Sequence, residues 1–313
     1  MTVDRTQVDI PAMQGTDHVG HAGRLIFLRQ LRRMQAHEAG SRTGEDIESV
    51  HKMRVAVRRM RSLLRLVGDY YPGKPIAVAG KSLRQIARAL GAIRDLDVLI
   101  LDLQEFSASL PPEGQQHANA LVSRLDRRRA KRRKRLNAYL DSKRYERALR
   151  QLENFAGNKT GRASRKLRPH QPQELRHVLP SLLHQRLAIV RAYDAVLPNA
   201  DDTRLHALRV ECKRLRYAIE FFAPVLGASA TSFLAFVTSM QDALGRINDI
   251  AVFVSRLQKL KKLSPEQAAI LDDYIACRNK ELAALRVTFY ELWARMNTRV
   301  QRRKFSDALL VLR

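Results

Sequence analysis

Apolar residues recur every three or four positions along most of this 313-residue chain. That spacing places apolar side chains on one face of an α-helix, whereas a strand would alternate at every second position. Ser264, Pro265 and Gln267 together predict a capped helix start with a capping box. Gly91 indicates a break within one run. The pattern predicts an all-α fold with helices at 17–39, 45–70, 75–105, 113–153, 174–196, 203–222, 231–262 and 265–304.

Segments of the first half recur in the second half in the same order and at nearly equal separation. Such self-similarity is the sequence signature of an internal repeat. The matching pairs are VHKMRVAVRRMRSLLRLV at 50–67 with LHALRVECKRLRYAIEFF at 205–222, LGAIRDLDVLI at 90–100 with LGRINDIAVFV at 244–254, and KRYERAL at 143–149 with RKFSDAL at 303–309.

The repeat divides the chain into two helical halves. A stretch rich in Gly, Asn, Ser, Pro and basic residues, at 154–173, is typical of a linker. Residues 1–16 indicate a flexible tail, which leaves 17–153 as the first repeat and 174–313 as the second. We therefore expect two helical bundles related by pseudo-two-fold symmetry.

The net charge of the chain narrows the range of candidate ligands. The chain has 57 Lys and Arg against 31 Asp and Glu, a formal net charge of +26. Such self-repulsion favours a compensating anion: nucleic acid, an acidic membrane surface or a phosphate polymer. A merely solvated, highly charged surface is the alternative. The two cysteines lack metal-type spacing, and we find neither a signal peptide nor an 18-residue apolar run, so we expect a cytoplasmic protein that does not span a membrane.

The first recurring segment predicts a helix with one cationic face. On a helical projection its basic residues fall within an arc of about 80°, opposite the apolar side chains. An ordinary solvated face mixes signs, because like charges one turn apart destabilise a helix. Arginine suits phosphate because its planar fork donates two parallel hydrogen bonds. The row consists of His51, Arg54, Arg58, Arg61 and Arg65.

The second copy repeats this design, with Glu220 where Arg65 ends the first row. One interpretation is an anion-binding surface to which both rows contribute. The alternative is a structural face paired with carboxylates of other helices, for which Asp95, Asp97 and Asp249 are available. The row of the second copy consists of His206, Arg209, Lys213 and Arg216.

Other basic residues extend the candidate surface. The helix after the first row carries three cations at spacings of three and four, and the first helix carries two on one face. The run at 127–135 is basic all round and indicates a solvated or auxiliary patch. The added candidates are Lys81, Arg84 and Arg88, and Arg29 and Arg33.

The paired segments VHKMRVAVRRMR and LHALRVECKRLR, followed by LGAIRDLDV and LGRINDIAV, resemble the conserved histidine α-helical domain, or CHAD domain. The resemblance covers roughly 17–313. It implies two antiparallel four-helix bundles with a basic central groove or channel, and binding of inorganic polyphosphate, in some members on polyphosphate granules. Glu220 departs from a symmetric site.

No catalytic pattern accompanies the basic rows. We find no phosphate-binding loop, no nucleophile–base arrangement and no paired acids, so we expect a binding protein without enzymatic activity, cofactor or metal. Asp95, Asp97 and Asp249 are expected to cap helices or to pair with Arg94 and Arg246. His51 and His206 either contact the anion or tie their helices to a neighbour. Nucleic acid is the alternative ligand, although aromatic residues for base stacking are few, at 6%.

Overall fold

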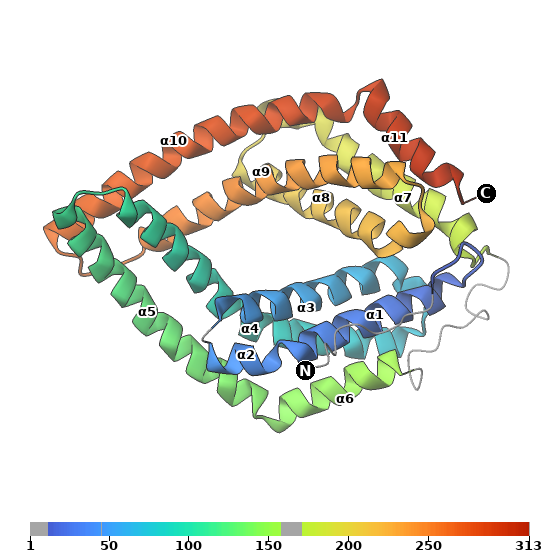
Figure 1. Ribbon diagram of the computed structural model, residues 1–313, viewed down its shortest axis with the longest axis horizontal. Coiled ribbons are helices and arrows are strands. Elements are labelled where there is room, and N and C mark those ends of the chain that lie inside the picture. The colour runs from blue at the N-terminus through green and yellow to red at the C-terminus, as the bar shows by residue number, and fades with distance from the viewer. Residues whose placement is uncertain (1–11, 45, 158–170, 313) are drawn as a thin grey trace, which may run out of the picture. The chain divides into compact units, whose positions relative to one another are not determined.

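The protein is described by a computed structural model, which covers residues 12–44, 46–157 and 171–312 (Figure 1). All regular elements in these ranges are helices, which confirms the predicted all-α class. In these ranges no helix is long and apolar enough to cross a membrane. The α-helices are α1 Val19–Ala36, α2 Glu38–Thr43, α3 Ile47–Val67, α4 Gly73–Ala108, α5 Pro112–Leu140, α6 Lys143–Ala156, α7 Leu175–Arg191, α8 Asp202–Phe222, α9 Ser229–Leu257, α10 Pro265–Met296 and α11 Arg299–Leu310.

The chain forms two compact units. Unit 1 comprises Met1–Ile100 and Leu125–Val178, and unit 2 comprises Leu101–Arg124 and Leu179–Arg313. The sequence analysis placed residues 101–124 in the first repeat, whereas their contacts place them in unit 2. The physical reason is a buried ion cluster around Asp102, which bonds to residues of unit 2. The internal repeat, the pseudo-two-fold relation and a groove shared by both halves stay predictions.

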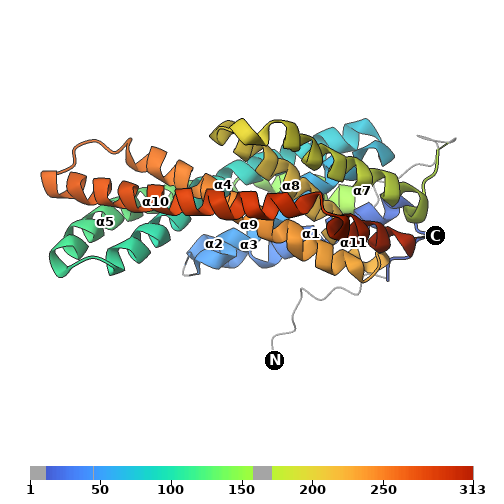
Figure 2. The same ribbon diagram turned by 90° about the horizontal axis from the view of Figure 1, so that it is seen from above.

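Helix packing within each unit follows the apolar faces. In unit 1, α1 packs against α3 and α6, and α2 packs against α3. In unit 2, α9 packs against α8, α10 and α11, as both views show (Figure 1 and Figure 2). The apolar side predicted for the first basic helix is buried in α3, at Met53, Val57, Met60, Leu63, Leu64 and Val67. The equivalent side of α8 is buried at Leu208, Cys212, Leu215, Ile219 and Phe222.

Helix boundaries differ from the prediction where polar caps interrupt an apolar run. The predicted helix 113–153 is split, because Ser142 caps a new helix by accepting a hydrogen bond from the Tyr145 amide. The predicted helix 265–304 is also split, at Thr298, whose hydroxyl donates to the Arg295 carbonyl at 2.8 Å and does not cap α11. The predicted break at Gly91 is wrong, since α4 runs through it. The capping box of Ser264 and Gln267 is confirmed.

The predicted tail and linker fall mostly on 1–11 and 158–170, which lie outside the described residues. Part of the predicted tail is ordered against the start of α7. The Arg176 amide donates to the Gly15 carbonyl at 2.8 Å, and the Leu175 amide donates to the Asp17 carbonyl at 2.9 Å. These hydrogen bonds satisfy amides at a helix start, which have no partner within the helix.

Candidate functional site

The first basic row lies on α3, on the side away from the buried core. Asp46 caps this helix by accepting a hydrogen bond from the Glu48 amide, so the row begins one turn inside a well-defined start. The side chains of His51, Arg54, Arg58 and Arg61 are half-buried, and Arg65 is exposed. The row therefore sits where its aliphatic stems can pack while its guanidinium groups reach the surface.

Helix α4 adds Arg84 to this row. The pKa of Arg61 lies below its ordinary value, first because the group is partly buried and then because Arg65, Arg84 and Arg54 repel its charge. Among the described residues, no carboxylate forms an ion pair with Arg61, Arg65 or Arg84. We call Arg54, Arg58, Arg61, Arg65 and Arg84 the α3–α4 cluster.

Glycines in the two LG segments lie beside the first arginine of each row. A Cβ on Gly91 would sit 3.8 Å from Arg54 Nε, and one on Gly245 would sit 3.9 Å from Arg209 Nε. A bulkier residue at either position would press on that guanidinium. The sequence analysis predicted a helix break at Gly91. The Leu-Gly pair that recurs in both segments instead indicates a glycine beside the first arginine of each row.

The two histidines have different surroundings. The pKa of His51 is lowered, chiefly by burial and then by Arg94, with Glu48 acting in the opposite direction. His206 is exposed, and its Nδ1 lies 2.5 Å from Asn248 Oδ1. Because an amide oxygen can only accept, Nδ1 is the donor in this contact. His206 also lines a pocket of about 490 Å³ in unit 2.

The second basic row lies on α8, and several of its groups have polar partners. Arg209 lies 3.8 Å from Asp249 and is 18% exposed, and Arg216 lies 3.5 Å from Glu220. Lys213 is half-buried. The acid at position 220, noted in the sequence, therefore does compensate one cation of this row.

The remaining candidate cations fall into separate groups. Arg29 and Arg33 lie on α1 and are exposed. The pKa of Arg33 is nevertheless lowered, first because the protein covers part of its guanidinium group and then because Arg29 and Arg59 repel its charge. Arg59 is a residue of α3 that projects about 120° from the row. On α4, Arg88 is exposed, and Lys81 lines a pocket together with α6.

The acidic residues pair differently from the prediction. Asp95 lies 3.8 Å from Arg54, and the fully buried Asp97 lies 3.6 Å from Arg129. The predicted partners are engaged elsewhere: Arg94 lies 3.7 Å from Glu48, and Arg246 binds Asp102 and Glu281. A carboxylate of the following helix thus reaches the first arginine of each row, as expected if the basic face is structural. The α3–α4 cluster nevertheless includes Arg61, Arg65 and Arg84, which have no carboxylate partner among the described residues.

Asp102 is the centre of a buried ion cluster in unit 2. It is 5% exposed and accepts hydrogen bonds from Arg246, from Tyr274 Oη and, at 2.9 Å, from Arg278 Nε. Glu281 accepts from both arginines as well. Every member of the cluster thus has a hydrogen-bond partner within it, which is typical of a structural network.

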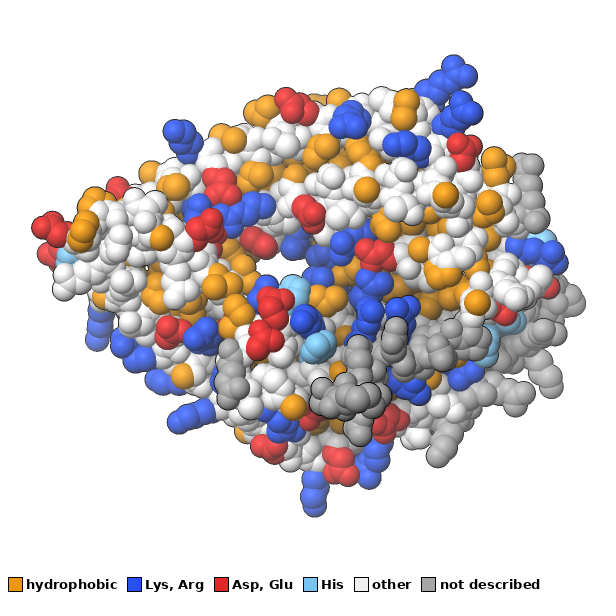
Figure 3. Space-filling view, viewed as in Figure 1, with side chains coloured by type: hydrophobic (Ala, Val, Ile, Leu, Met, Phe, Trp, Pro, Cys, Tyr) orange, Lys and Arg blue, Asp and Glu red, His pale blue; other side chains and the backbone are white. Residues whose placement is uncertain are grey.

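The basic run of α5 forms a solvated surface. Arg127, Arg128, Lys131, Arg132 and Lys134 are exposed, and Figure 3 shows Lys and Arg side chains projecting outward along this helix. Within the described ranges, no three His, Cys, Asp or Glu side chains gather into a possible metal site.

Comparisons with known proteins identify the family to which the chain belongs. The CHAD domain profile matches residues 25–258. A crystal structure of the CHAD domain from the plant Ricinus communis is similar, with 26% identity and a TM-score of 0.70 over 91% of this chain and 96% of that one. PptA from Streptomyces chartreusis shares the fold, with 15% identity and a TM-score of 0.69 over 89% of this chain and 100% of that one. No curated protein matches by sequence. The chain belongs to the CHAD domain family.

Proposed function

We propose that this protein binds inorganic polyphosphate, with the α3–α4 cluster as the principal contact and the α8 row as a second one. The CHAD family is associated with polyphosphate binding. The observation that carries the proposal for this chain is the set of like charges around Arg61. Like charges gathered on one surface raise the free energy of the unbound protein, and a polyanion relieves that repulsion.

The shape of the row favours a linear polymer over a small ion. Arg54 and Arg65 are eleven residues apart on one helix, so the row extends about 16 Å at 1.5 Å per residue. A pyrophosphate reaches one or two of these arginines, whereas a long chain contacts all of them. Linked contacts on one chain add as avidity, which separate small ions cannot provide. Long chains should therefore bind far more tightly than pyrophosphate or orthophosphate.

Nucleic acid is the weaker competitor in this proposal. Its phosphates would meet the same cations and bind without sequence preference. Tight binding of single strands also uses exposed aromatic rings as stacking platforms. Among the described Phe, Tyr and Trp residues Tyr290 is the one exposed side chain, at 38% exposure, and it belongs to α10, which carries neither basic row.

The test is a competition for labelled long-chain polyphosphate. Unlabelled polyphosphate should displace the label at concentrations far below those required of DNA, RNA or pyrophosphate. Displacement by DNA or RNA at the same phosphate concentration as polyphosphate would overturn the proposal in favour of a general nucleic-acid binder. Equal displacement by pyrophosphate would replace it with a small-molecule site.

The proposal describes a binding module and not a catalyst. Incubation of the protein with polyphosphate and Mg²⁺ or Mn²⁺ should release no orthophosphate above the protein-free rate. Release that is lost on changing Asp95→Asn or Asp249→Asn would show that the carboxylates beside Arg54 and Arg209 serve catalysis.

A further inference from the structure

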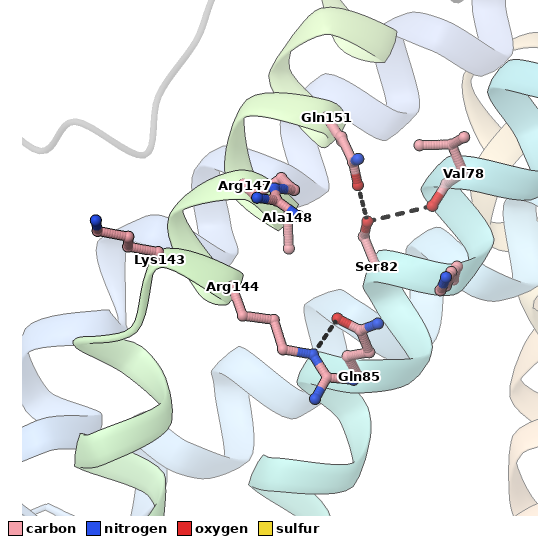
Figure 4. A pocket seen from close by; sticks show the side chains of 9 residues that line it. Val78, Ser82, Gln85, Lys143, Arg144, Arg147, Ala148 and Gln151 are labelled. Atoms are coloured by element: carbon pink, nitrogen blue, oxygen red, sulfur yellow. Dashed lines mark hydrogen bonds between the residues drawn. The ribbon is translucent and has the colours of Figure 1, made fainter.

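A second cationic site lies in unit 1 between α4 and α6. It is a pocket of about 560 Å³, within the size range of pockets that hold small-molecule ligands, roughly 300–1,000 Å³. Figure 4 shows its two walls, one from each helix. We call it the α4–α6 pocket, lined by Val78, Lys81, Ser82 and Gln85 of α4 and by Lys143, Arg144, Arg147, Ala148 and Gln151 of α6.

The pocket lining carries four positive charges and no carboxylate. Among the described residues, none of these four cations has an ion-pair partner. Glu146 is next in sequence to the cations of α6, but it lies 3.5 Å from Arg150. The α4–α6 pocket is therefore positive without local compensation. Its cations are Lys81, Lys143, Arg144 and Arg147.

The position of these cations on α6 is unfavourable for the helix itself. Lys143 and Arg144 stand at its first two positions, directly after the capping Ser142. A helix start has partial positive charge, so acidic residues stabilise it and basic ones destabilise it. Free amides at the same end favour a bound anion. Intrinsic helix stability therefore gives no reason for this placement, whereas an anion in the pocket does.

Hydrogen bonds across the pocket hold the two helices and orient one cation. Ser82 is 2% exposed, and its hydroxyl lies 2.7 Å from Gln151 Oε1 as donor. Arg144 Nε donates to Gln85 Oε1 at 3.2 Å, and Figure 4 shows this side chain reaching from α6 to α4. Because Nε makes that bond, the two terminal nitrogens of Arg144 keep their donors for a ligand.

We infer that the α4–α6 pocket binds a compact anion with two or three phosphoryl groups. One phosphoryl group carries a charge of roughly −1.5 to −2 at pH 7, so four cations match two such groups better than one. The amides of Gln85 and Gln151 supply further donors to phosphoryl oxygens. Free pyrophosphate or tripolyphosphate, a nucleoside triphosphate and the end of a long polyphosphate chain all present this chemistry. The inference does not depend on polyphosphate binding by the α3–α4 cluster.

The experiment is titration calorimetry of the full chain with pyrophosphate, tripolyphosphate, ATP and long-chain polyphosphate. The pocket variant is Arg144→Glu with Arg147→Glu, and Arg144→Gln with Arg147→Gln is a milder second version. The matched control is Arg132→Glu with Arg135→Glu, two exposed residues of α5 that are also three positions apart. A third variant neutralises the α3–α4 cluster through Arg61→Gln, Arg65→Gln and Arg84→Gln. Circular dichroism verifies that each variant is folded.

Tripolyphosphate affinity should fall at least tenfold in both pocket variants and less than threefold in the control and cluster variants. Long-chain affinity should show the opposite order, with the larger loss in the cluster variant. ATP binding equal to that of tripolyphosphate supports recognition of the phosphates alone. Loss of tripolyphosphate binding in the control, or in the cluster variant alone, overturns the inference. A pocket variant that weakens only the long chain overturns it as well, because the pocket would then be part of the polymer's path.

Discussion

Neutralising three of the five arginines of the α3–α4 cluster separates a binding role from a structural one, because the two roles give stability changes of opposite sign. The change is Arg61→Gln, Arg65→Gln and Arg84→Gln together. These arginines have no carboxylate partner among the described residues, and the pKa of Arg61 is lowered by burial and by its like-charged neighbours. Like charges one helical turn apart destabilise by about 0.2–0.5 kcal/mol a pair. The unliganded variant should therefore be more stable by about 0.5–1 kcal/mol.

Polyphosphate binding should change in the other direction. A hydrogen bond to a charged group contributes about 1.5–3 kcal/mol when partly buried, as at Arg61. An exposed charge contributes up to about 1 kcal/mol, as at Arg65 and Arg84. The sum of about 4 kcal/mol corresponds to roughly a thousandfold higher Kd. The dependence of log affinity on log salt should also become shallower by about 2, by analogy with single-stranded nucleic acid.

Urea unfolding measures the stability change, and fluorescence anisotropy of labelled polyphosphate at several salt concentrations measures the affinity. Arg129→Gln is the control, because Arg129 lies 3.6 Å from the fully buried Asp97 and 2.8 Å from Asp126. Its loss should destabilise the protein by about 1–3 kcal/mol. A triple variant that is destabilised like this control, with polyphosphate affinity unchanged, would refute the argument and show the row to be structural.

Three further changes test individual contacts. The pKa of His51 is lowered in the folded protein, so the unfolded chain binds a proton at His51 more tightly and the free energy of unfolding should fall as pH drops through about 6.5. Polyphosphate affinity should rise over the same pH range, because binding of the polyanion takes up that proton. His51→Gln should flatten both pH profiles. Gly91→Ala should stabilise the protein by about 0.5–1 kcal/mol in urea unfolding, because alanine is favoured over glycine inside a helix and the added carbon makes only an ordinary contact of 3.8 Å with Arg54 Nε. Destabilisation would show that the guanidinium cannot adjust. Asp102→Asn should destabilise by about 3–5 kcal/mol, because Arg278, 8% exposed, and Arg246 are then left with Glu281 as their one carboxylate partner in the cluster; a midpoint unchanged in urea would contradict this.

The sequence predicted the helices and their buried faces well, because a spacing of three and four is a local property. Met53 and Met60 of α3 are buried, and so are Leu208 and Leu215 of α8. Boundaries were less predictable, since a single polar cap decides them. Ser142 ends one helix and starts the next within a run whose periodicity continues across it.

The candidate site was only partly predictable because its composition depends on how the helices pack. The row on α3 follows from spacing within one segment. The grouping of Arg84 with Arg61, and of Arg33 with Arg59, depends on which helices contact α3 and at what rotation. No local pattern carries that information. The α4–α6 pocket likewise forms only because two helices meet whose bonded residues are 59 and 69 positions apart in the chain.

Ion pairs between residues far apart in the sequence could not be predicted either, and unit 2 shows this most clearly. Asp102, Arg246 and Arg278 lie far apart in the sequence, yet they form one buried network. Arg246 was expected to pair with a nearby acid, and the structure gives it Asp102 and Glu281 instead. A charge takes the partner that burial places beside it, whatever its sequence separation, because an unpaired buried charge is strongly unfavourable.

The two basic rows therefore differ in the free energy they can offer an anion. On α8, Arg209 and Arg216 have carboxylates within 4 Å, so an incoming phosphate gains their attraction only against existing ion pairs. On α3 and α4, Arg65 and Arg84 both repel Arg61, and a phosphate offsets that repulsion as it binds. The first arginine has the same kind of partner in both rows, Asp95 for Arg54 and Asp249 for Arg209. The two rows therefore differ in capacity chiefly because Glu220 pairs with Arg216. Binding free energy should consequently come mainly from the α3–α4 cluster, with the α8 row contributing through avidity once the polymer is held.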